Sequence, residues 1–236
     1  MPLDKGIRRL AIVPARGGSK RIPNKNTRDF CGAPMITHIL KTASNSNLFT
    51  KIHVSTESAI VQSVVAEHDF SPDFPRPTDL ADDHTPIMPV LRFVTGEYQS
   101  RGEAFDEIWL LMACAPLVES SDLLSAAELF QAHNKQHQVL AVGEYQTPIE
   151  RAFIRANSGI LNPINPDKLI SRSQDLKPHY FDAGAFSVYS STQILEPDRF
   201  NPDQEIVGYL LPKNRAVDID DEDDWRLAES FYLAKN

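Results

Sequence analysis

The sequence predicts an α/β fold, a mostly parallel sheet flanked by helices, on three observations. Strand-like apolar runs alternate with helix-like segments along the chain, which is typical of strands joined by helical crossovers. The strongest apolar run, residues 107–113, lies between two helix-like segments, as a central strand does. A length of 236 residues, with 42% hydrophobic and 24% charged residues, suits one such domain.

The elements are expected in a regular order. An apolar run at residues 10–13 predicts a buried first strand, and a loop rich in glycine and cations follows it. Pro72, Pro75 and Pro77 predict an irregular stretch, because proline fixes φ and lacks an N–H group. We expect further strands at residues 51–55, 107–113, 139–143, 185–189 and 206–211, and helices at residues 34–44, 57–68, 86–98, 121–134 and 222–234.

Two of the helices carry additional signals. Ser121 and Asp122 are suitable caps for the amphipathic helix at 121–134. The closing helix at 222–234 begins with acids and presents apolar residues, among them Trp225 and Phe231, for packing.

Residues 146–180 differ from the rest of the chain. They contain four prolines and few long apolar runs, which fits a flexible linker. Their scattered isoleucine, phenylalanine and leucine residues favour a packed excursion or an oligomer arm instead. We therefore predict a single domain over residues 1–236, with residues 146–180 as an excursion within it.

Composition excludes several classes of protein. The chain has 24 Lys+Arg and 32 Asp+Glu, a net charge of −8, which argues against broad binding to nucleic acid. It lacks the apolar run of about 18 residues that a membrane span needs. Residues 1–9 lack the apolar region of a secretory signal. Cys31 and Cys114 are too few for a disulfide framework. We expect a cytoplasmic protein with neither nucleic acid nor membrane as partner.

A basic loop at residues 15–26 is the first candidate site. It carries four cations, and Gly17 and Gly18 let its backbone N–H groups approach a ligand. Because ligands collect at the carboxyl ends of parallel strands, the loop predicts a polyphosphate site. Its spacing matches neither a P-loop nor a dinucleotide fingerprint. The alternative, a solvated basic turn, is disfavoured by the four cations Arg16, Lys20, Arg21 and Lys25.

An acidic segment near the C-terminus is the second candidate site. Six acids lie within residues 218–224. On an extended segment Asp218 and Asp220 share one side, and two carboxylates with phosphate oxygens suit Mg²⁺, with Mn²⁺ as the alternative. The acids at 221–224 begin the last helix, where they stabilise the positive end of its dipole.

The basic loop also carries a family resemblance. Its sequence, AIVPARGGSKRIPNKN, resembles the motif of the CMP-sialic acid synthetase family, the cytidylyltransferases that activate nine-carbon acidic sugars. Matching segments run from Ile12 to about Glu229. The resemblance implies a Rossmann-like, GT-A-like nucleotidyltransferase fold, CTP as a substrate and a homodimer. It also implies that residues 146–180 are a dimerisation and sugar-site excursion.

The resemblance also implies residue roles. Asp218 and Asp220 would hold the metal, and the catalytic set would be Arg16, Lys20, Lys25 and Asp218. A segment at 74–85 resembles the family's R-P-x-x-L-A-x-D stretch, in which the arginine reads cytosine. A surface ion pair of Arg76 with Asp79 or Asp82 is the alternative. The nucleotide-binding set is then Ala15, Gly17, Gly18, Ser19, Arg21, Asn26, Arg76 and Thr85.

Three further segments indicate a branch of the family. Met112 and Cys114 depart from the sialic acid pattern L-Q-P-T-S-P-L and resemble the pseudaminic acid branch. Segments around Arg172 and Asp182 resemble its R-S-Q-D-L and D-A-G-Q-F motifs, with Ala185 in place of glutamine. Sugar-binding residues would be Met112, Arg172 and Asp182. For Arg172, a loop held by local hydrogen bonds is the alternative.

The expected reaction joins CTP to a nonulosonic acid, with pseudaminic acid favoured, and releases diphosphate. N-acetylneuraminic or legionaminic acid is the alternative substrate. Two further alternatives stay open. One is a metal-dependent glycosyltransferase, because Asp-Ile-Asp also fits a DxD site, and the other is a regulator that binds CTP without turnover.

Overall fold

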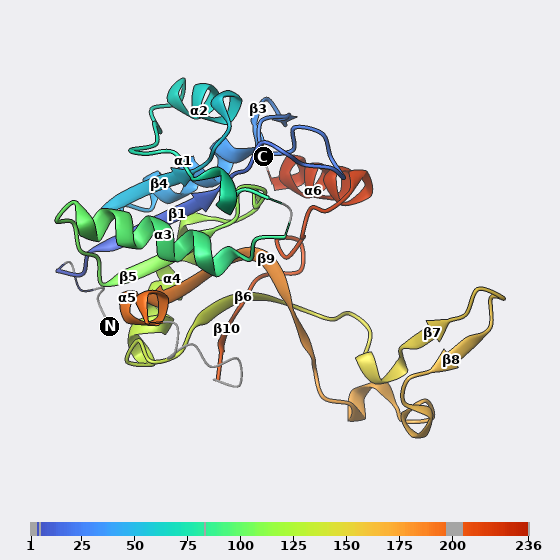
Figure 1. Cartoon of the computed structure of the whole chain (residues 1–236). Helices are drawn as coiled ribbons and strands as arrows, with labels where there is room; N and C mark the ends of the chain where they lie inside the picture. The colour runs from blue at the N-terminus through green and yellow to red at the C-terminus, as the bar shows by residue number, and fades with distance from the viewer. Residues whose placement is uncertain (1–3, 5, 83, 197–204, 236) are drawn as a thin grey trace.

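In a computed structural model, residues 4, 6–82, 84–196 and 205–235 are described. A six-stranded sheet with strand order β10-β6-β9-β5-β1-β4 forms the centre of the molecule (Figure 1). Helices α1, α2 and α3 lie beside it, and α6 lies near the loop that follows β1. The sheet comprises β1 (Arg9–Pro14), β4 (Lys51–Ser55), β5 (Glu107–Leu111), β6 (Val139–Glu144), β9 (Tyr180–Ser190) and β10 (Val207–Leu210).

The helices connect these strands. They are α1 (Met35–Asn45), α2 (Ala59–Ala66), α3 (Ile87–Ser100), α4 (Ser120–Ala132), α5 (Ser191–Leu195) and α6 (Glu222–Lys235). Short 3₁₀ helices cover Thr78–Leu80, Ile149–Arg151, Pro166–Lys168 and Ser173–Asp175. Two small hairpins complete the described chain: β2 (Asp29–Phe30) with β3 (Ala33–Pro34), and β7 (Phe153–Arg155) with β8 (Leu161–Pro163).

Strand direction confirms the mostly parallel sheet, with one exception. β1 pairs in parallel with β4 and β5, and β10 pairs in parallel with β6. β9 is antiparallel to both β5 and β6. The reason lies in the connection, because the chain leaves the sheet after β6 and returns directly along β9 without a helical crossover.

Residues 145–179 form the excursion between β6 and β9. They carry the β7–β8 hairpin and project away from the sheet (Figure 1). Large apolar side chains on this excursion are exposed, among them Ile154, Ile160 and Ile170, the last at 93%. We call residues 145–179 the arm.

The predicted element boundaries agree with the structure to within about two residues, except for the strand predicted at 185–189. The strand predicted at 185–189 is the C-terminal half of the longer β9. The helix predicted at 57–68 is the shorter α2 (Ala59–Ala66), because the Ser58 side chain caps its start by accepting a hydrogen bond from the Val61 N–H group. The strand predicted at 107–113 ends at Leu111. None of the helices in the described ranges has the length and apolar character needed to cross a bilayer.

Three apolar clusters fix the elements that carry the loops. The two larger ones pack on the sheet. The third joins Ile22 of the basic loop, Phe30 of β2, Ile219 of the acidic segment and Trp225 of α6, all of them nearly inaccessible to solvent. This cluster therefore holds the basic loop and the acidic segment against each other.

A buried histidine predicts how stability depends on pH. The Nδ1 atom of His53 lies 3.0 Å from the Tyr98 hydroxyl, which itself donates to Asp73. Nδ1 is therefore the protonated nitrogen, and Nε2 is buried with no hydrogen-bond partner among the described residues. Protonating Nε2 would bury an unpartnered charge, so burial lowers the pKa of His53 to about 4 from 6.5.

The unfolded chain binds this proton near pH 6.5, whereas the folded chain binds it only near pH 4. The contribution of neutral His53 to the free energy of unfolding is thus fully present above pH 6.5. About 3 kcal/mol of it is lost as the pH falls toward 4. Urea unfolding at several pH values measures this. His53→Gln should make the free energy of unfolding depend less on pH between 6.5 and 4. A smaller pH dependence should remain from His38, because burial also lowers the pKa of that residue. An unchanged pH dependence in the variant would contradict the role given to His53.

Candidate active site

The basic loop leaves the carboxyl end of β1 and is fixed at its start. The Ala15 N–H group donates to the Ser55 carbonyl oxygen at the end of β4, at 2.9 Å. The Gly17 N–H group donates to Glu57 Oε1 at 2.7 Å. A Cβ on Gly17 would lie 2.9 Å from the Ser58 Cβ, so only glycine fits this approach. The first part of the loop is therefore held against the β4–α2 connection.

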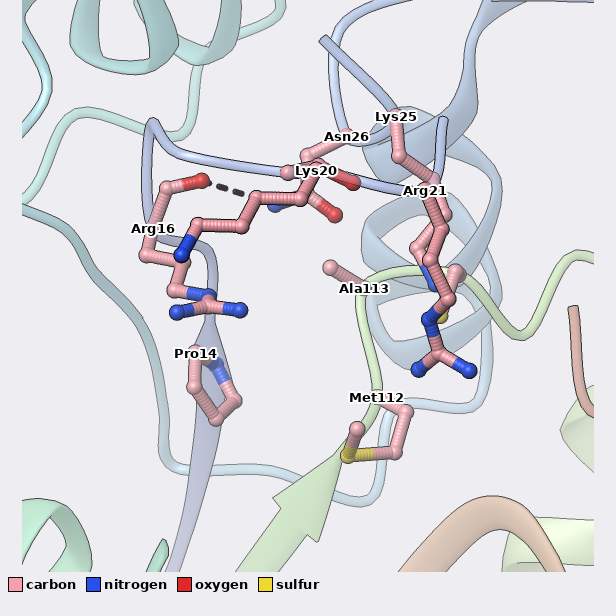
Figure 2. Close-up of a pocket in the computed structure, with 10 residues that line it drawn as sticks. Pro14, Arg16, Lys20, Arg21, Lys25, Asn26, Met112 and Ala113 are labelled. Atoms are coloured by element: carbon pink, nitrogen blue, oxygen red, sulfur yellow. Dashed lines mark hydrogen bonds between the residues drawn. The ribbon is translucent and has the colours of Figure 1, made fainter. Parts of the chain in front are cut away.

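A cavity of about 430 Å³ opens on the inner side of the loop. Arg16 and Lys20 extend from one side of it and Arg21 and Lys25 from another, with Met112 at the end of β5 facing them (Figure 2). The Asn26 side chain donates to the Arg16 carbonyl oxygen at 3.1 Å and ties the two ends of the loop together. The full lining is Pro14, Arg16, Ser19, Lys20, Arg21, Lys25, Asn26, Met112, Ala113 and Cys114.

The acidic segment lies directly beside this cavity. Arg21 Nη1 is 2.7 Å from Asp220 Oδ2, and Lys25 Nζ donates to the Ile219 carbonyl oxygen at 2.6 Å. Ile219 is fully buried, so the acids on either side of it, Asp218 and Asp220, face the opposite way and line a second cavity. The cations and the paired carboxylates thus meet in one place although they are about 200 residues apart in the chain.

The later acids of the segment serve the helix. The Asp221 carboxylate accepts hydrogen bonds from the backbone N–H groups of Asp223 and Asp224 at the start of α6. These hydrogen bonds lower the pKa of Asp221. Glu222 pairs with Arg28, and Asp223 pairs with Arg226. These acids have structural partners, which leaves Asp218 and Asp220 as the pair facing the cavity.

The second cavity measures about 500 Å³ and adjoins the first. The two share Arg21, Lys25, Met112 and Cys114 in their linings. Its remaining lining comes from the start of α3, from β5, from β9 and from the acidic segment, namely Ile87, Leu110, Asp182, Gly184, Ala185, Phe186, Ser187, Asp218 and Asp220. One ligand can therefore extend from the cationic cavity into the second.

Gly184 on β9 sets the place of Asp218. It has a φ of +59°, and a Cβ at this position would lie 2.7 Å from the Asp218 carboxylate. The Gly184 N–H group also donates to Asp182 Oδ1 at 2.9 Å. A glycine here thus lets the carboxylate of Asp218 pack directly against the backbone of β9.

Gly184→Ala is expected to displace Asp218 and lower turnover about 10- to 100-fold, because small misplacements of reacting groups have effects of this size. Gly102→Ala is the matched control. It also has a positive φ, of +83°, but nothing lies within 4 Å of its added Cβ. Equal losses of activity in the two variants would show that backbone strain, and not the contact with Asp218, is responsible.

Arg76 and Thr85 occupy different surroundings from the residues above. Arg76 is buried and donates to Ser55 through Nε (3.1 Å to Oγ) and Nη2 (2.6 Å to the carbonyl oxygen). The side-chain hydrogen bonds of Arg76 therefore go to Ser55 and not to Asp79 or Asp82. The alternative, a surface ion pair of Arg76 with one of these acids, is wrong. Thr85 donates to Asp82 Oδ1 at 2.9 Å. Neither residue lines the two cavities.

Arg172 lies apart from the cavities of its own chain. It is on the arm, and its Nε donates to Asp175 Oδ2 at 2.8 Å. This bond is the local hydrogen bonding that the alternative interpretation of Arg172, a loop held by such bonds, predicts. Asp182 and Met112, the other two residues expected at the sugar, both line the second cavity.

Sequence reasoning missed several residues at the site. Glu57 follows β4 directly and anchors Gly17, and an acid at the carboxyl end of a parallel strand was a usable signal. Leu110, Ala185 and Ser187 line the second cavity. Leu110 and Ser187 carried no local signal, because their place depends on the pairing of β5 with β9. Ala185 lies in a motif, but no site role was assigned to it.

The carboxylates of Asp218 and Asp220 suit a divalent cation. Burial first, and then the charge of Asp220, raises the pKa of Asp218, and a bound cation would relieve both. No cluster of three or more possible metal ligands occurs among the described residues. Two carboxylates, with phosphate oxygens and waters for the other positions, suit Mg²⁺, which keeps several waters when bound.

Fold and site together define the class of protein. A mostly parallel sheet carries a cationic loop at its carboxyl edge, opposite a carboxylate pair, and this arrangement suits the phosphates of a nucleotide. Residues 10–152 match the family described as Cytidylyltransferase. The pseudaminic acid cytidylyltransferase of Campylobacter jejuni subsp. jejuni serotype O:2 is 34% identical over 227 residues, 96% of this chain and 97% of that protein. This chain therefore belongs to the cytidylyltransferase family.

Other relatives agree with this assignment. The CMP-N,N'-diacetyllegionaminic acid synthase of Legionella pneumophila subsp. pneumophila is 28% identical over 231 residues, 95% of this chain and 96% of that protein. A structure of CMP:2-keto-3-deoxy-manno-octonic acid synthetase complexed with CTP aligns with a TM-score of 0.71 at 14% identity. It covers 97% of this chain and 100% of that one. At that identity the structural match shows the fold.

Proposed function

We propose that the protein transfers CMP from CTP to a nonulosonic acid, with pseudaminic acid as the favoured substrate, and releases diphosphate. The observation that carries the proposal is the contact of Arg21 and Lys25 with the 218–220 segment, at the junction of the two cavities. It fits a nucleotide whose phosphates lie among the cations and whose α-phosphate faces the carboxylates. Pseudaminic acid is favoured because the relative at 34% identity is named for it.

The reaction is an in-line displacement. The anomeric oxygen of the sugar forms a bond to the α-phosphorus, the bond from that phosphorus to the β-phosphate oxygen breaks, and diphosphate leaves. Arg16, Lys20 and Arg21 offset the charge of the triphosphate and of the leaving diphosphate. Lys25 and Asn26 position the α-phosphate, while the N–H groups of Gly18 and Ser19 and the Ser19 hydroxyl bind phosphate oxygens. The Gly17 N–H group is held by Glu57 and does not take part.

The remaining roles follow from position. Asp218 and Asp220 would hold Mg²⁺, which supplies a positive charge to offset that of the phosphates. The candidates to take the proton of the anomeric hydroxyl are Asp218 and a water held by the metal ion. Arg76 and Thr85 are assigned to the cytosine and ribose side. This rests on sequence, because the two cavities do not include them.

We also propose a homodimer formed through the arm. Its exposed isoleucines, from Ile154 to Ile170, are numerous for a segment that makes little contact with the sheet. Pairing would bury them and would bring Arg172 toward the sugar cavity of a second copy. Sedimentation at micromolar concentration measures this, and a monomer would contradict it. We place the reaction in the cytoplasm, where CTP is available.

A product assay tests the activity itself. Purified protein is mixed with CTP, Mg²⁺ and pseudaminic, legionaminic or N-acetylneuraminic acid, and diphosphate and CMP-sugar are measured. Diphosphate release that requires a sugar supports the proposal. Release of UDP from a nucleotide sugar would favour the glycosyltransferase alternative, and binding of CTP without turnover would favour a regulator.

A further inference from the structure

A buried ion pair lies three residues before Asp218 in the chain. Arg215 Nη1 is 2.7 Å from Asp122 Oδ2 and 2.8 Å from Glu119 Oε2. The Arg215 side chain is 16% exposed and that of Asp122 only 1%. Arg215 lines neither of the two cavities, so it is not placed to contact a ligand in them. Any effect of Arg215 on the site therefore goes through the groups that it holds.

The carboxylate of Asp122 is a fixed point of the fold. It lies in the first turn of α4, and its Oδ2 atom also accepts the Glu119 N–H group at 2.8 Å, as part of a capping box. The Tyr209 hydroxyl of β10 donates to its other oxygen, Oδ1, at 2.9 Å. One buried carboxylate thus joins the start of α4, strand β10 and the turn that contains Arg215.

The chain between Arg215 and the carboxylate pair has little freedom. The Arg215 and Ala216 N–H groups both donate to the Pro212 carbonyl oxygen, at 2.8 and 3.1 Å, in a tight turn. Ala216 approaches β6 closely, since a Cβ on Gly143 would lie 2.9 Å from the Ala216 Cβ. Val217 packs against the apolar cluster that holds the basic loop and the acidic segment together. A displacement of Arg215 would therefore be passed on to the carboxylates.

The same ion pair reaches a second segment of the site. The chain that connects β5 to α4 begins at Met112 and ends at Glu119, and its residues Met112 and Cys114 line both cavities. Glu119 and Asp122 stand at the far end of this connection. Arg215 therefore ties the connection to the acidic segment, from behind the cavities that both of them line.

The carboxylate pair needs support of this kind. Asp218 and Asp220 carry like charges close together, and without a cation they repel each other. Between them, the buried side chain of Ile219 and the bond from Lys25 to its carbonyl oxygen fix the backbone. On the N-terminal side of the pair, the nearest charged residue of the chain is Arg215.

From these contacts we infer that Arg215 is a positioning residue of the metal site: through Asp122 and Glu119 it holds Asp218 and Asp220 at the spacing that a divalent cation bound to CTP requires. Residues that orient metal ligands from behind typically affect metal affinity or activity by roughly 10- to 100-fold. The inference rests on the function proposed above and adds to it a residue that touches neither substrate.

Arg215→Met and Arg9→Met test the inference as a matched pair. Arg9 also forms a buried ion pair, with its Nε 2.8 Å from Glu107 Oε2, but it lies at the opposite end of β1 from the basic loop and lines neither cavity. The Kd of CTP is measured by calorimetry without sugar, in the presence and absence of Mg²⁺. Arg215→Met should raise the Kd about 10-fold or more with Mg²⁺ and leave it unchanged without Mg²⁺, because the cationic loop is intact.

Turnover gives the second measurement. In the presence of sugar, Arg215→Met should lower kcat about 10- to 100-fold. Arg215→Lys keeps the positive charge and should recover part of both kcat and the Mg²⁺-dependent affinity for CTP. Arg9→Met should change neither quantity at a temperature where thermal unfolding shows the variant to be folded.

Each methionine variant leaves a buried carboxylate without its partner, which destabilises a fold. Both are therefore also made as neutral pairs, Arg215→Met with Asp122→Asn and Arg9→Met with Glu107→Gln, for which the same difference is expected. Equal effects in the Arg215 and Arg9 variants would overturn the inference, because the loss would then come from the fold alone.

Two results separate this inference from the proposed function. If CTP binding by the unchanged protein did not respond to Mg²⁺, the metal site and the role of Arg215 would both be excluded. If the unchanged protein released no diphosphate with any sugar, the proposed reaction would be wrong, while the Mg²⁺-dependent binding of CTP would still decide the role of Arg215.

Discussion

Replacing Asp218 with asparagine is expected to lower kcat on the order of 10³-fold, because it removes one of the two carboxylates that we propose hold the cation. Asparagine has the same shape but no charge. Burial and the neighbouring Asp220 already disfavour the charged form of Asp218, as its raised pKa shows. The variant should therefore fold with undiminished thermal stability, and a loss of turnover reports on chemistry and not on folding.

Asp223→Asn is the matched control. It changes net charge by the same amount in the same acidic segment, but Asp223 is exposed and pairs with Arg226. Diphosphate release is measured for both variants over a range of Mg²⁺ concentrations. Asp218→Asn should also need more Mg²⁺ for half-maximal activity. Similar kcat values for the two variants would exclude the metal-binding role of Asp218.

Much of the site could be predicted from sequence because its signals are local. The basic loop directly follows a buried strand, so the rule that ligands collect at the carboxyl edge places Arg21 and Lys25 without any tertiary information. The side of the chain that Asp218 and Asp220 share follows from the period of an extended segment. Their contact with the loop is the part that only the structure provides.

The rest depended on long-range pairing. The antiparallel direction of β9 follows from the direct return of the chain out of the arm, and a short apolar run at 185–189 does not encode it. The part of the second cavity lined by Leu110, Ala185 and Ser187 arises where β5 and β9 pair, so no single segment predicts it. Arg172 carried a motif but lies on the arm, and its placement at a sugar depends on a second copy of the chain.

The basic loop and the acidic segment are joined most directly by Lys25, which lines both cavities. Its Nζ donates to the Ile219 carbonyl oxygen at 2.6 Å and lies 4.0 Å from Asp220 Oδ1. In the reaction proposed above, its ammonium group would lie between the phosphates and the carboxylate pair. There its positive charge would offset the charge that grows on the reacting phosphate.

Lys25→Met keeps the aliphatic stem and removes the charge. We expect kcat to fall about 10²- to 10³-fold, the loss typical of removing one preorganised charge-stabilising donor. The KM for CTP should rise less, because Arg16, Lys20 and Arg21 still face the triphosphate. Steady-state kinetics with CTP varied at saturating sugar separates the two effects.

Two further variants distinguish catalysis from loop anchoring. Lys25→Arg keeps a positive charge and should recover part of kcat, whereas Lys41→Ala, an exposed lysine of α1 outside both cavities, should leave kcat and KM unchanged. If Lys25 only anchored the Ile219 carbonyl oxygen, Lys25→Met would lower thermal stability and raise KM while kcat at saturation stayed near normal. That result would remove Lys25 from the catalytic set, because a charge that acts on the reacting phosphate must affect kcat.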